Sequence, residues 1–165
     1  MSDRQFRFAY FTAIYDETVA FYRDGMNMPV VHSWNRSPDD RGTLIAAASG
    51  LIEVLAQPHS DAEHLFDSRP PQGAFMVIEL EDLEGAYQSA LDNELPIQQK
   101  LGNQSWGHRS FCVREPNGLT LYLFSEADSF DPRSDEKRSP IPAPASLRKQ
   151  ILEIPSLADL FGIFG

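Results

Sequence analysis

The sequence predicts an α+β fold built from two tandem strand–helix–three-strand (βαβββ) modules, followed by a C-terminal extension. Two observations support this prediction. A short β-rich run leads through Asp16 into an amphipathic segment, and the pattern recurs at Asp82, 66 positions later (82 − 16). After each amphipathic segment, three further β-rich runs follow, bounded by Gly, Pro, Asn and Asp. We expect the modules at about residues 5–57 and 73–126.

In the first module, a strand at residues 6–12 precedes the amphipathic segment. Asp16 is the expected N-cap of the helix, because a carboxylate there can accept hydrogen bonds from free backbone N–H groups. Apolar residues then recur at helical spacing, and Asn27 and Pro29 end the helix. The expected apolar face consists of Val19, Phe21, Tyr22 and Met26. Strands are expected at residues 30–35, 43–48 and 51–56.

The second module repeats this order, and its last two strands are joined by the turn sequence Glu115-Pro116-Asn117-Gly118. Its strands are expected at residues 75–80, 97–101, 110–114 and 119–124, and its helix at residues 83–93. The domain therefore ends near residue 126. Residues 127–165 are expected to form a proline-rich linker and a short apolar C-terminal helix.

Charge and cysteine content limit the classes of function. The chain has 14 Lys and Arg against 24 Asp and Glu, a formal net charge of −10, which disfavours nucleic acid and anionic membranes and favours a cationic ligand. The N-terminal residues lack the apolar run of a secretory signal, so we expect a cytoplasmic protein. Cys112 is the one cysteine, and its apolar strand context predicts a buried, inert thiol.

Two motifs resemble the vicinal oxygen chelate superfamily, which includes glyoxalase I, extradiol dioxygenases and the bleomycin resistance proteins. They are DETVAFY at residues 16–22 and WGHRSF at residues 106–111, the latter followed by EPNG. The resemblance implies curved sheets that close around a cavity, often completed by a second chain, and we therefore expect a homodimer. In metal-dependent members, a His or Gln and a Glu from the first and last strands of the modules bind a divalent ion.

Carried onto this sequence, the ligand positions of that family fall on Ala9, Glu53, Phe75 and Tyr122. Only Glu53 could bind a metal, so we expect neither a metal nor another cofactor. The resemblance instead implies an aromatic lining at Phe75 and Tyr122, suited to stacking on a flat ligand. In this interpretation, Glu53 holds a cation or a hydrogen-bond donor.

Other aromatic and titratable residues complete the expected site. His32 and Trp34 alternate on one strand face, and the resemblance places Trp34 and Trp106 at the mouth of the cavity. His59 and His64 lie five apart, which does not fit the spacing of a zinc motif, so an ordinary polar loop is expected there. The expected ligand-binding residues are Phe11, His32, Trp34, Glu53, Phe75, Trp106 and Tyr122.

Three functions remain open from the sequence. The first is metal-independent binding or sequestration of a small aromatic or cationic molecule, as the bleomycin resistance proteins do. The second is an enzyme on the same scaffold, a lyase, isomerase or dioxygenase, using either a metal site at other residues or Glu53 in acid–base catalysis, with Glu79 as its partner if Glu79 faces the cavity. The third is an interaction protein whose C-terminal segment docks on a partner.

Overall fold

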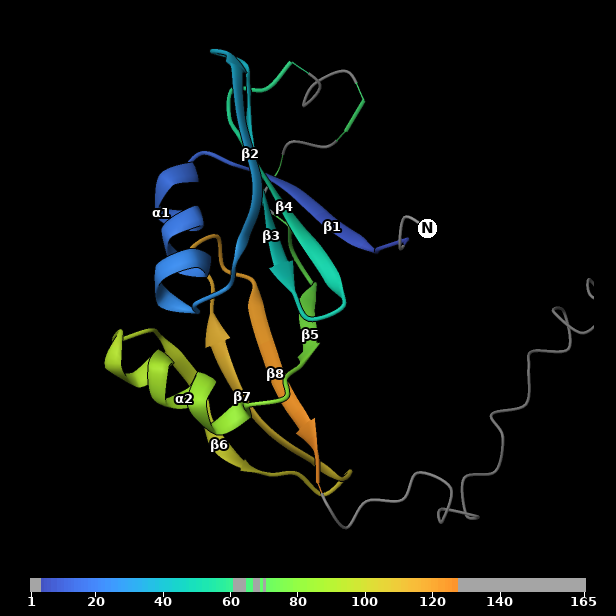
Figure 1. Ribbon diagram of the computed structural model, residues 1–165, viewed down its shortest axis with the longest axis vertical. Helices are drawn as coiled ribbons and strands as arrows, with labels where there is room; N and C mark the ends of the chain where they lie inside the picture. The colour runs from blue at the N-terminus through green and yellow to red at the C-terminus, as the bar shows by residue number, and fades with distance from the viewer. Residues whose placement is uncertain (1–3, 61–64, 67–68, 70, 128–165) are drawn as a thin grey trace, which may run out of the picture. The chain divides into compact units, whose positions relative to one another are not determined.

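The computed structural model describes residues 4–60, 65–66, 69 and 71–127, which fold as two modules of one sheet and one helical segment each (Figure 1). This confirms the predicted α+β fold of two tandem modules. The expected linker and C-terminal helix lie outside the described residues, apart from residue 127. The elements are β1 (Arg7–Thr12), α1 (Tyr15–Ala20), the π-helical turn η1 (Phe21–Gly25), β2 (Val30–Ser37), β3 (Asp40–Ala47), β4 (Gly50–Ala56), β5 (Phe75–Glu79), α2 (Leu83–Asp92), β6 (Ile97–Asn103), β7 (His108–Arg114) and β8 (Thr120–Glu126).

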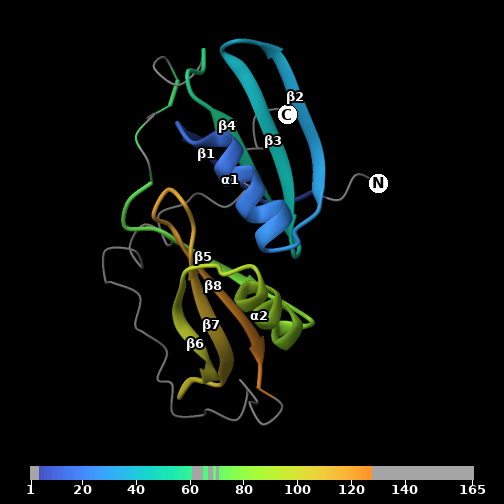
Figure 2. The same cartoon turned by 90° about the vertical axis from the view of Figure 1, so that its left-hand side faces the viewer.

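Each module has one four-stranded sheet with the same topology. Sheet A has the order β1-β4-β3-β2 and sheet B the order β5-β8-β7-β6. In both sheets the first and last strands of the module pair in parallel, and the other neighbours pair antiparallel. The helices α1 and α2 lie against one face of their sheets (Figures 1 and 2). No described helix covers the opposite face of either sheet, and we call these two surfaces the open faces.

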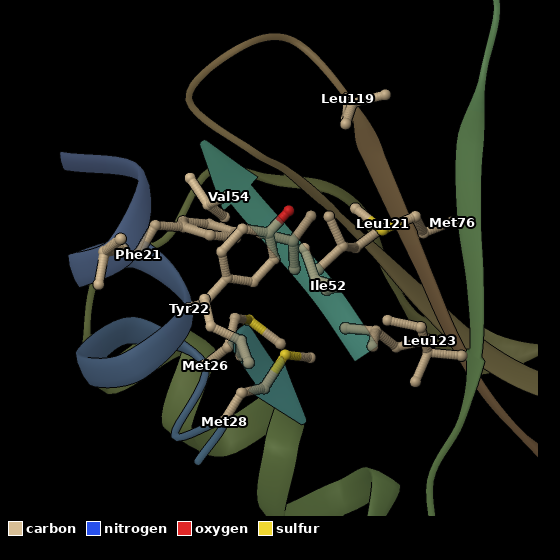
Figure 3. Close-up of a cluster of buried hydrophobic side chains, with 14 of the residues drawn as sticks. Phe21, Tyr22, Met26, Met28, Ile52, Val54, Met76, Leu119, Leu121 and Leu123 are labelled. Atoms are coloured by element: carbon tan, nitrogen blue, oxygen red, sulfur yellow. The ribbon is translucent and has the colours of Figure 1, made fainter. Parts of the chain in front are cut away.

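The core lies between the helices and the covered faces, as the alternation of strand residues dictates. Tyr22, at 0% exposure, inserts from η1 toward β4 and β8, where it meets Ile52 and Leu121 in a shared cluster (Figure 3). The apolar face predicted for the first helix is buried in full. Burial of each such large apolar side chain contributes about 1.5–3 kcal/mol to stability, so the cluster spanning both modules holds them together.

A buried polar network also joins the modules. Glu115, 1% exposed, accepts a hydrogen bond from Tyr10 Oη of β1 at 2.7 Å and another from the backbone N–H of Asn117 at 2.7 Å. Thr12 Oγ1 donates to Asn117 Oδ1 at 2.6 Å. The predicted turn closes with a 2.8 Å hydrogen bond from the N–H of Gly118 to the carbonyl oxygen of Glu115. The φ of Gly118 is +94°, which favours glycine. The turn of the second module is thereby fixed to the first strand of the chain.

The start of the first helix differs from the prediction. Its N-cap is Ile14, whose N–H donates to Thr12 Oγ1 at 3.0 Å, while Asp16 lies in the first turn and pairs with Arg41. Asp82 is an N-cap as predicted, accepting from the N–H of Gly85 at 2.9 Å. The helices therefore start 68 positions apart, at Tyr15 and Leu83 (83 − 15), so alignment of Asp16 with Asp82 was wrong by two residues.

Candidate functional site

The open face of sheet A brings together four of the predicted ligand-binding residues. Strand pairing sets Ala9 beside Glu53, Glu53 beside Leu44, and Leu44 beside His32. The next row across the same four strands is Phe11, Leu55, Gly42 and Trp34. Because directly paired residues point to the same side of a sheet, Phe11, His32, Trp34 and Glu53 share this face.

Trp34 is held in a defined position on this face. A Cβ atom on Gly42 would lie 2.2 Å from Trp34 Cζ2, so the indole ring occupies space that only glycine leaves at that position. The ring Nε1–H donates to Asp40 Oδ1 at 2.8 Å. His32 stacks at 5.9 Å between ring centroids with an interplanar angle of 22°, and the Arg36 guanidinium lies 5.6 Å from the ring centroid. These contacts provide a preorganised aromatic surface.

Glu53 has a cationic neighbour that the sequence analysis missed. Arg7 Nη1 lies 3.6 Å from Glu53 Oε2, with the Glu53 side chain 21% exposed and the Arg7 side chain 51% exposed. The signal was available in part, because Arg7, Ala9 and Phe11 alternate along one strand and must share a face. The partner of Arg7 could not be inferred without the register of β1 on β4.

Phe11 lines a cavity of about 680 Å³ beside β1. Its ring lies 5.2 Å from that of His59 and 6.2 Å from that of Phe66. His59, expected in an ordinary polar loop, thus contacts a predicted site residue; His64 lies outside the described residues. The cavity is lined by the consecutive residues Phe8, Ala9, Tyr10 and Phe11, and by Leu55, Phe66, Arg69, Pro71, Gln72 and Ala74.

The open face of sheet B carries the other predicted residues. Tyr122 Oη accepts a hydrogen bond from Trp106 Nε1 at 3.2 Å and lies 3.2 Å from His108 Nδ1. The His108 ring stacks on Phe124 with centroids 4.1 Å apart and an interplanar angle of 19°. His108 and Phe124 were not among the expected site residues, although Phe124 follows Tyr122 by two positions and therefore shares its strand face.

Phe75 lies on the same open face as Tyr122, but not beside it. It pairs with Thr120, whereas Val77 pairs with Tyr122 and Glu79 with Phe124. The equivalent of the Ala9–Glu53 pair in the first module is therefore Val77–Tyr122. The Phe75 side chain is 62% exposed and contributes with Val77 to a groove of about 540 Å³ that also contacts Phe6 and Phe8 of the first module.

Cys112 lies on the open face of sheet B but is buried there. It pairs with Tyr122 across β7 and β8, and its Sγ–H donates to Gln99 Oε1 at 3.4 Å. Burial raises the pKa of the Cys112 thiol, which disfavours the nucleophilic thiolate. Both properties agree with the prediction of a buried, inert thiol.

A sequence model of the Glyoxalase/Bleomycin resistance protein/Dioxygenase superfamily matches residues 4–123 of the 165 in the chain. This chain belongs to that superfamily. The match covers both modules, in agreement with the family resemblance of the two sequence motifs. A search of curated protein sequences found no match.

Several solved structures share the fold of this glyoxalase-superfamily chain at low sequence identity. TioX from Micromonospora sp. ML1 has a TM-score of 0.62 and 12% identity, covering 74% of this chain and 98% of its own. A superfamily member from Sphaerobacter thermophilus has a TM-score of 0.58 and 16% identity, covering 74% and 97%. Another from Alicyclobacillus acidocaldarius has a TM-score of 0.56 and 19% identity, covering 79% and 95%. At these identities the likeness extends to the fold alone.

The residues at the superfamily's metal-binding positions do not fit a divalent ion. The paired positions hold Ala9 with Glu53 and Val77 with Tyr122, a donor set of one carboxylate and one phenol. Within the described ranges, no group of three or more His, Cys, Asp and Glu side chains could hold a metal ion. A stable site needs three or four such ligands. In the same part of the chain, no helix is long and apolar enough to cross a membrane.

Proposed function

We propose that this protein binds and sequesters a small aromatic molecule on the open faces of its two sheets, without a metal. The observation that carries the proposal is the content of the four positions where metal-dependent relatives are expected to hold their ligands. Here those positions are Ala9, Glu53, Val77 and Tyr122, which offer space, apolar surface and an aromatic ring, and one carboxylate where several metal donors are needed.

The aromatic groups on both faces support an aromatic ligand. Trp34 is fixed by Asp40 and by the absence of a side chain at Gly42, so little conformational entropy is lost when a ring stacks on it. Tyr122 is likewise restrained by Trp106 through its hydroxyl oxygen. A pair of aromatic rings in a favourable arrangement contributes about 0.5–1.5 kcal/mol beyond the burial of their surface. The net charge of −10 supports a ligand that carries some positive charge.

We further propose that the protein acts as a cytoplasmic homodimer. The open face of sheet B leaves large apolar side chains in water, including Phe75, Val77 and Trp106, of which Trp106 is 48% exposed. Exposed apolar groups in this number favour a surface that another molecule covers. A second copy placed over the open faces would bury these groups and close the binding site.

The proposal is tested by titrating the full-length protein with 9-aminoacridine, a planar aromatic cation, and following ligand fluorescence. Trp34→Ala and Tyr122→Ala should each weaken binding by about 5- to 150-fold, which corresponds to about 1–3 kcal/mol for a contact that carries binding energy. Leu91→Ala is the control, because Leu91 is exposed on α2, away from the open faces. Equal affinity in all three variants would remove both aromatic residues from the site.

The alternative is a lyase, isomerase or dioxygenase that uses Glu53 in acid–base catalysis. One observation favours it, because Glu53 is a partly buried carboxylate whose strand neighbours are Ala9 and Leu44. The hypothesised partner Glu79 belongs to sheet B, whereas Glu53 belongs to sheet A. The two hypotheses differ in the fate of the ligand. A ligand recovered chemically unchanged after long incubation supports sequestration, and conversion that Glu53→Gln abolishes supports the enzyme.

A further inference from the structure

We infer that the aromatic ligand carries a zwitterionic head group, with an ammonium and a carboxylate on neighbouring atoms, which Glu53 and Arg7 bind together. This inference rests on the proposed function and specifies its ligand class. The acidic composition by itself favours a simple cation as ligand, and the sequence analysis predicted that Glu53 binds it. The neighbouring guanidinium on the same open face changes that expectation.

The separation of the two side chains leaves both able to bind a ligand. Arg7 Nη1 and Glu53 Oε2 are 3.6 Å apart, within ion-pair range but longer than a hydrogen bond between nitrogen and oxygen, typically about 2.7–3.2 Å. A guanidinium has five N–H donors and a carboxylate accepts at about four sites, and this pair consumes few of them. The two groups therefore present adjacent, opposite charges with unused hydrogen-bonding capacity.

Adjacent opposite charges select against an ion of a single sign. A ligand ammonium placed against Glu53 is attracted by the carboxylate and repelled by the guanidinium beside it, so most of the Coulomb gain cancels. A simple carboxylate meets the reverse arrangement. A zwitterion places its ammonium toward Glu53 and its carboxylate toward Arg7, and both interactions are then favourable. Charge complementarity of this kind gives specificity for the matching partner.

The Glu53 carboxylate lies in a partly apolar frame, whereas the Arg7 guanidinium is half exposed. Glu53 is flanked on the neighbouring strands by Ala9 and Leu44, and Leu51 and Leu55 lie two positions away along its own strand. This apolar frame limits access of water to the carboxylate, and charges interact more strongly where water is excluded. Ala9, which pairs directly with Glu53, carries only a methyl group and so does not cover the carboxylate.

The distance to the stacking surface suits a compact aromatic zwitterion. Trp34 lies two strands away from Glu53 and one two-residue step along the sheet. Strands lie about 4.8 Å apart and rise about 3.3 Å per residue, so the two Cα atoms are separated by roughly 12 Å. The Trp34 ring extends over Gly42 of β3 and shortens that gap, whereas the Glu53 carboxylate is directed toward Arg7 on β1. The space left is comparable with an amino-acid head joined to one ring system.

The experiment compares indole itself with three indole derivatives that differ in the charged groups on their side chains. L-tryptophan has both charges, tryptamine only the ammonium, indole-3-propionate only the carboxylate, and indole neither. Isothermal titration of the full-length protein should show L-tryptophan binding at least tenfold more tightly than any of the other three. Glu53→Gln should abolish the preference for L-tryptophan over indole-3-propionate, and Arg7→Gln the preference over tryptamine. Arg23→Gln is the matched control, because the exposed Arg23 pairs with Asp24 on η1.

The outcomes separate this inference from the proposed function. Tryptamine binding as tightly as L-tryptophan would overturn the zwitterion and leave Glu53 as a site for a simple cation. Equal affinity for all four indoles, or binding of 9-aminoacridine alone, would also overturn the zwitterion while leaving aromatic binding intact. Failure of the four indoles and of 9-aminoacridine to bind would contradict both. A preference for L-tryptophan that survives Glu53→Gln and Arg7→Gln would move the head-group site elsewhere.

Discussion

Gly42→Ala should displace the Trp34 ring without removing any aromatic group. The new Cβ would lie 2.2 Å from Trp34 Cζ2, whereas carbon atoms in contact stay about 3.5–4.0 Å apart, so the ring must move by about 1.5 Å. Such a movement breaks the 2.8 Å bond from Trp34 Nε1 to Asp40, worth about 1 kcal/mol. Overpacking adds strain of the same order, and we expect a total destabilisation of about 2 kcal/mol.

Tryptophan fluorescence can follow the Trp34 ring, because the chain has two tryptophans and the other one can be replaced. In a Trp106→Phe background, the emission comes from Trp34 alone, and Gly42→Ala should shift it to longer wavelength as the ring moves into water. Urea denaturation of the same proteins gives the change in the free energy of unfolding. The affinity for 9-aminoacridine should fall by about tenfold, because a displaced ring loses about 1.4 kcal/mol of stacking and preorganisation.

Gly102→Ala is the matched control for this substitution. A Cβ atom there meets nothing closer than the carbonyl oxygen of Lys100 at 4.0 Å, so stability and emission should stay close to those of the parent. A neutral surface change alters the free energy of unfolding by about 0.5 kcal/mol at most. If Gly42→Ala stays within that range of the parent and its emission maximum does not change, the packing of Trp34 on Gly42 is refuted.

Three further predictions concern the network between the modules and the open face of sheet B. Glu115→Ala should lower the free energy of unfolding by about 2–3 kcal/mol in urea, because buried donors lose a charged acceptor, whereas the exposed Glu126→Ala should not. Burial raises the pKa of the Tyr10 phenol, so the folded state keeps a proton that the unfolded chain loses above about pH 10. The free energy of unfolding should therefore stay constant just below that pH and fall above it. The fall with pH should be less steep in Tyr10→Phe, and an equal slope in both proteins would contradict this explanation. Tyr122→Phe should increase the solvent quenching of Trp106 emission, because Trp106 Nε1 loses its acceptor, and an unchanged quenching constant would exclude the bond.

Period-two alternation carried most of the fold prediction. Phe75, Val77 and Glu79 share one face of β5, as the alternation predicts, because burial constrains the register of a two-faced strand. The turn at Glu115–Gly118 was equally clear from its residue types. The helix start was not, because Asp16 and Asp82 are equally good caps as isolated residues. In the structure the first helix begins after Ile14, whose carbonyl accepts from the N–H of Thr18 at 2.9 Å and whose own N–H donates to Thr12 Oγ1.

Alternation predicted which candidate residues share a strand face, but not how they pair across strands. Alternation placed His32 with Trp34, and the structure shows them stacked. The ion pair between Arg7 and Glu53 depends on how strands 46 positions apart align (53 − 7), which no local pattern encodes. The packing of the Trp34 ring on Gly42 likewise depends on the pairing of β2 with β3. Side-chain partners across strands follow from register, and register is a property of the whole sheet.

The central claim is that the open faces bind an organic ligand and no metal. The most direct test is a native mass spectrum of the untagged protein, purified gently from its own cells, since one spectrum reports the oligomer, any metal and any retained small molecule. We predict a dimer that carries an organic adduct of aromatic composition and no stoichiometric divalent ion. A stoichiometric divalent ion whose removal abolishes ligand binding would contradict the account.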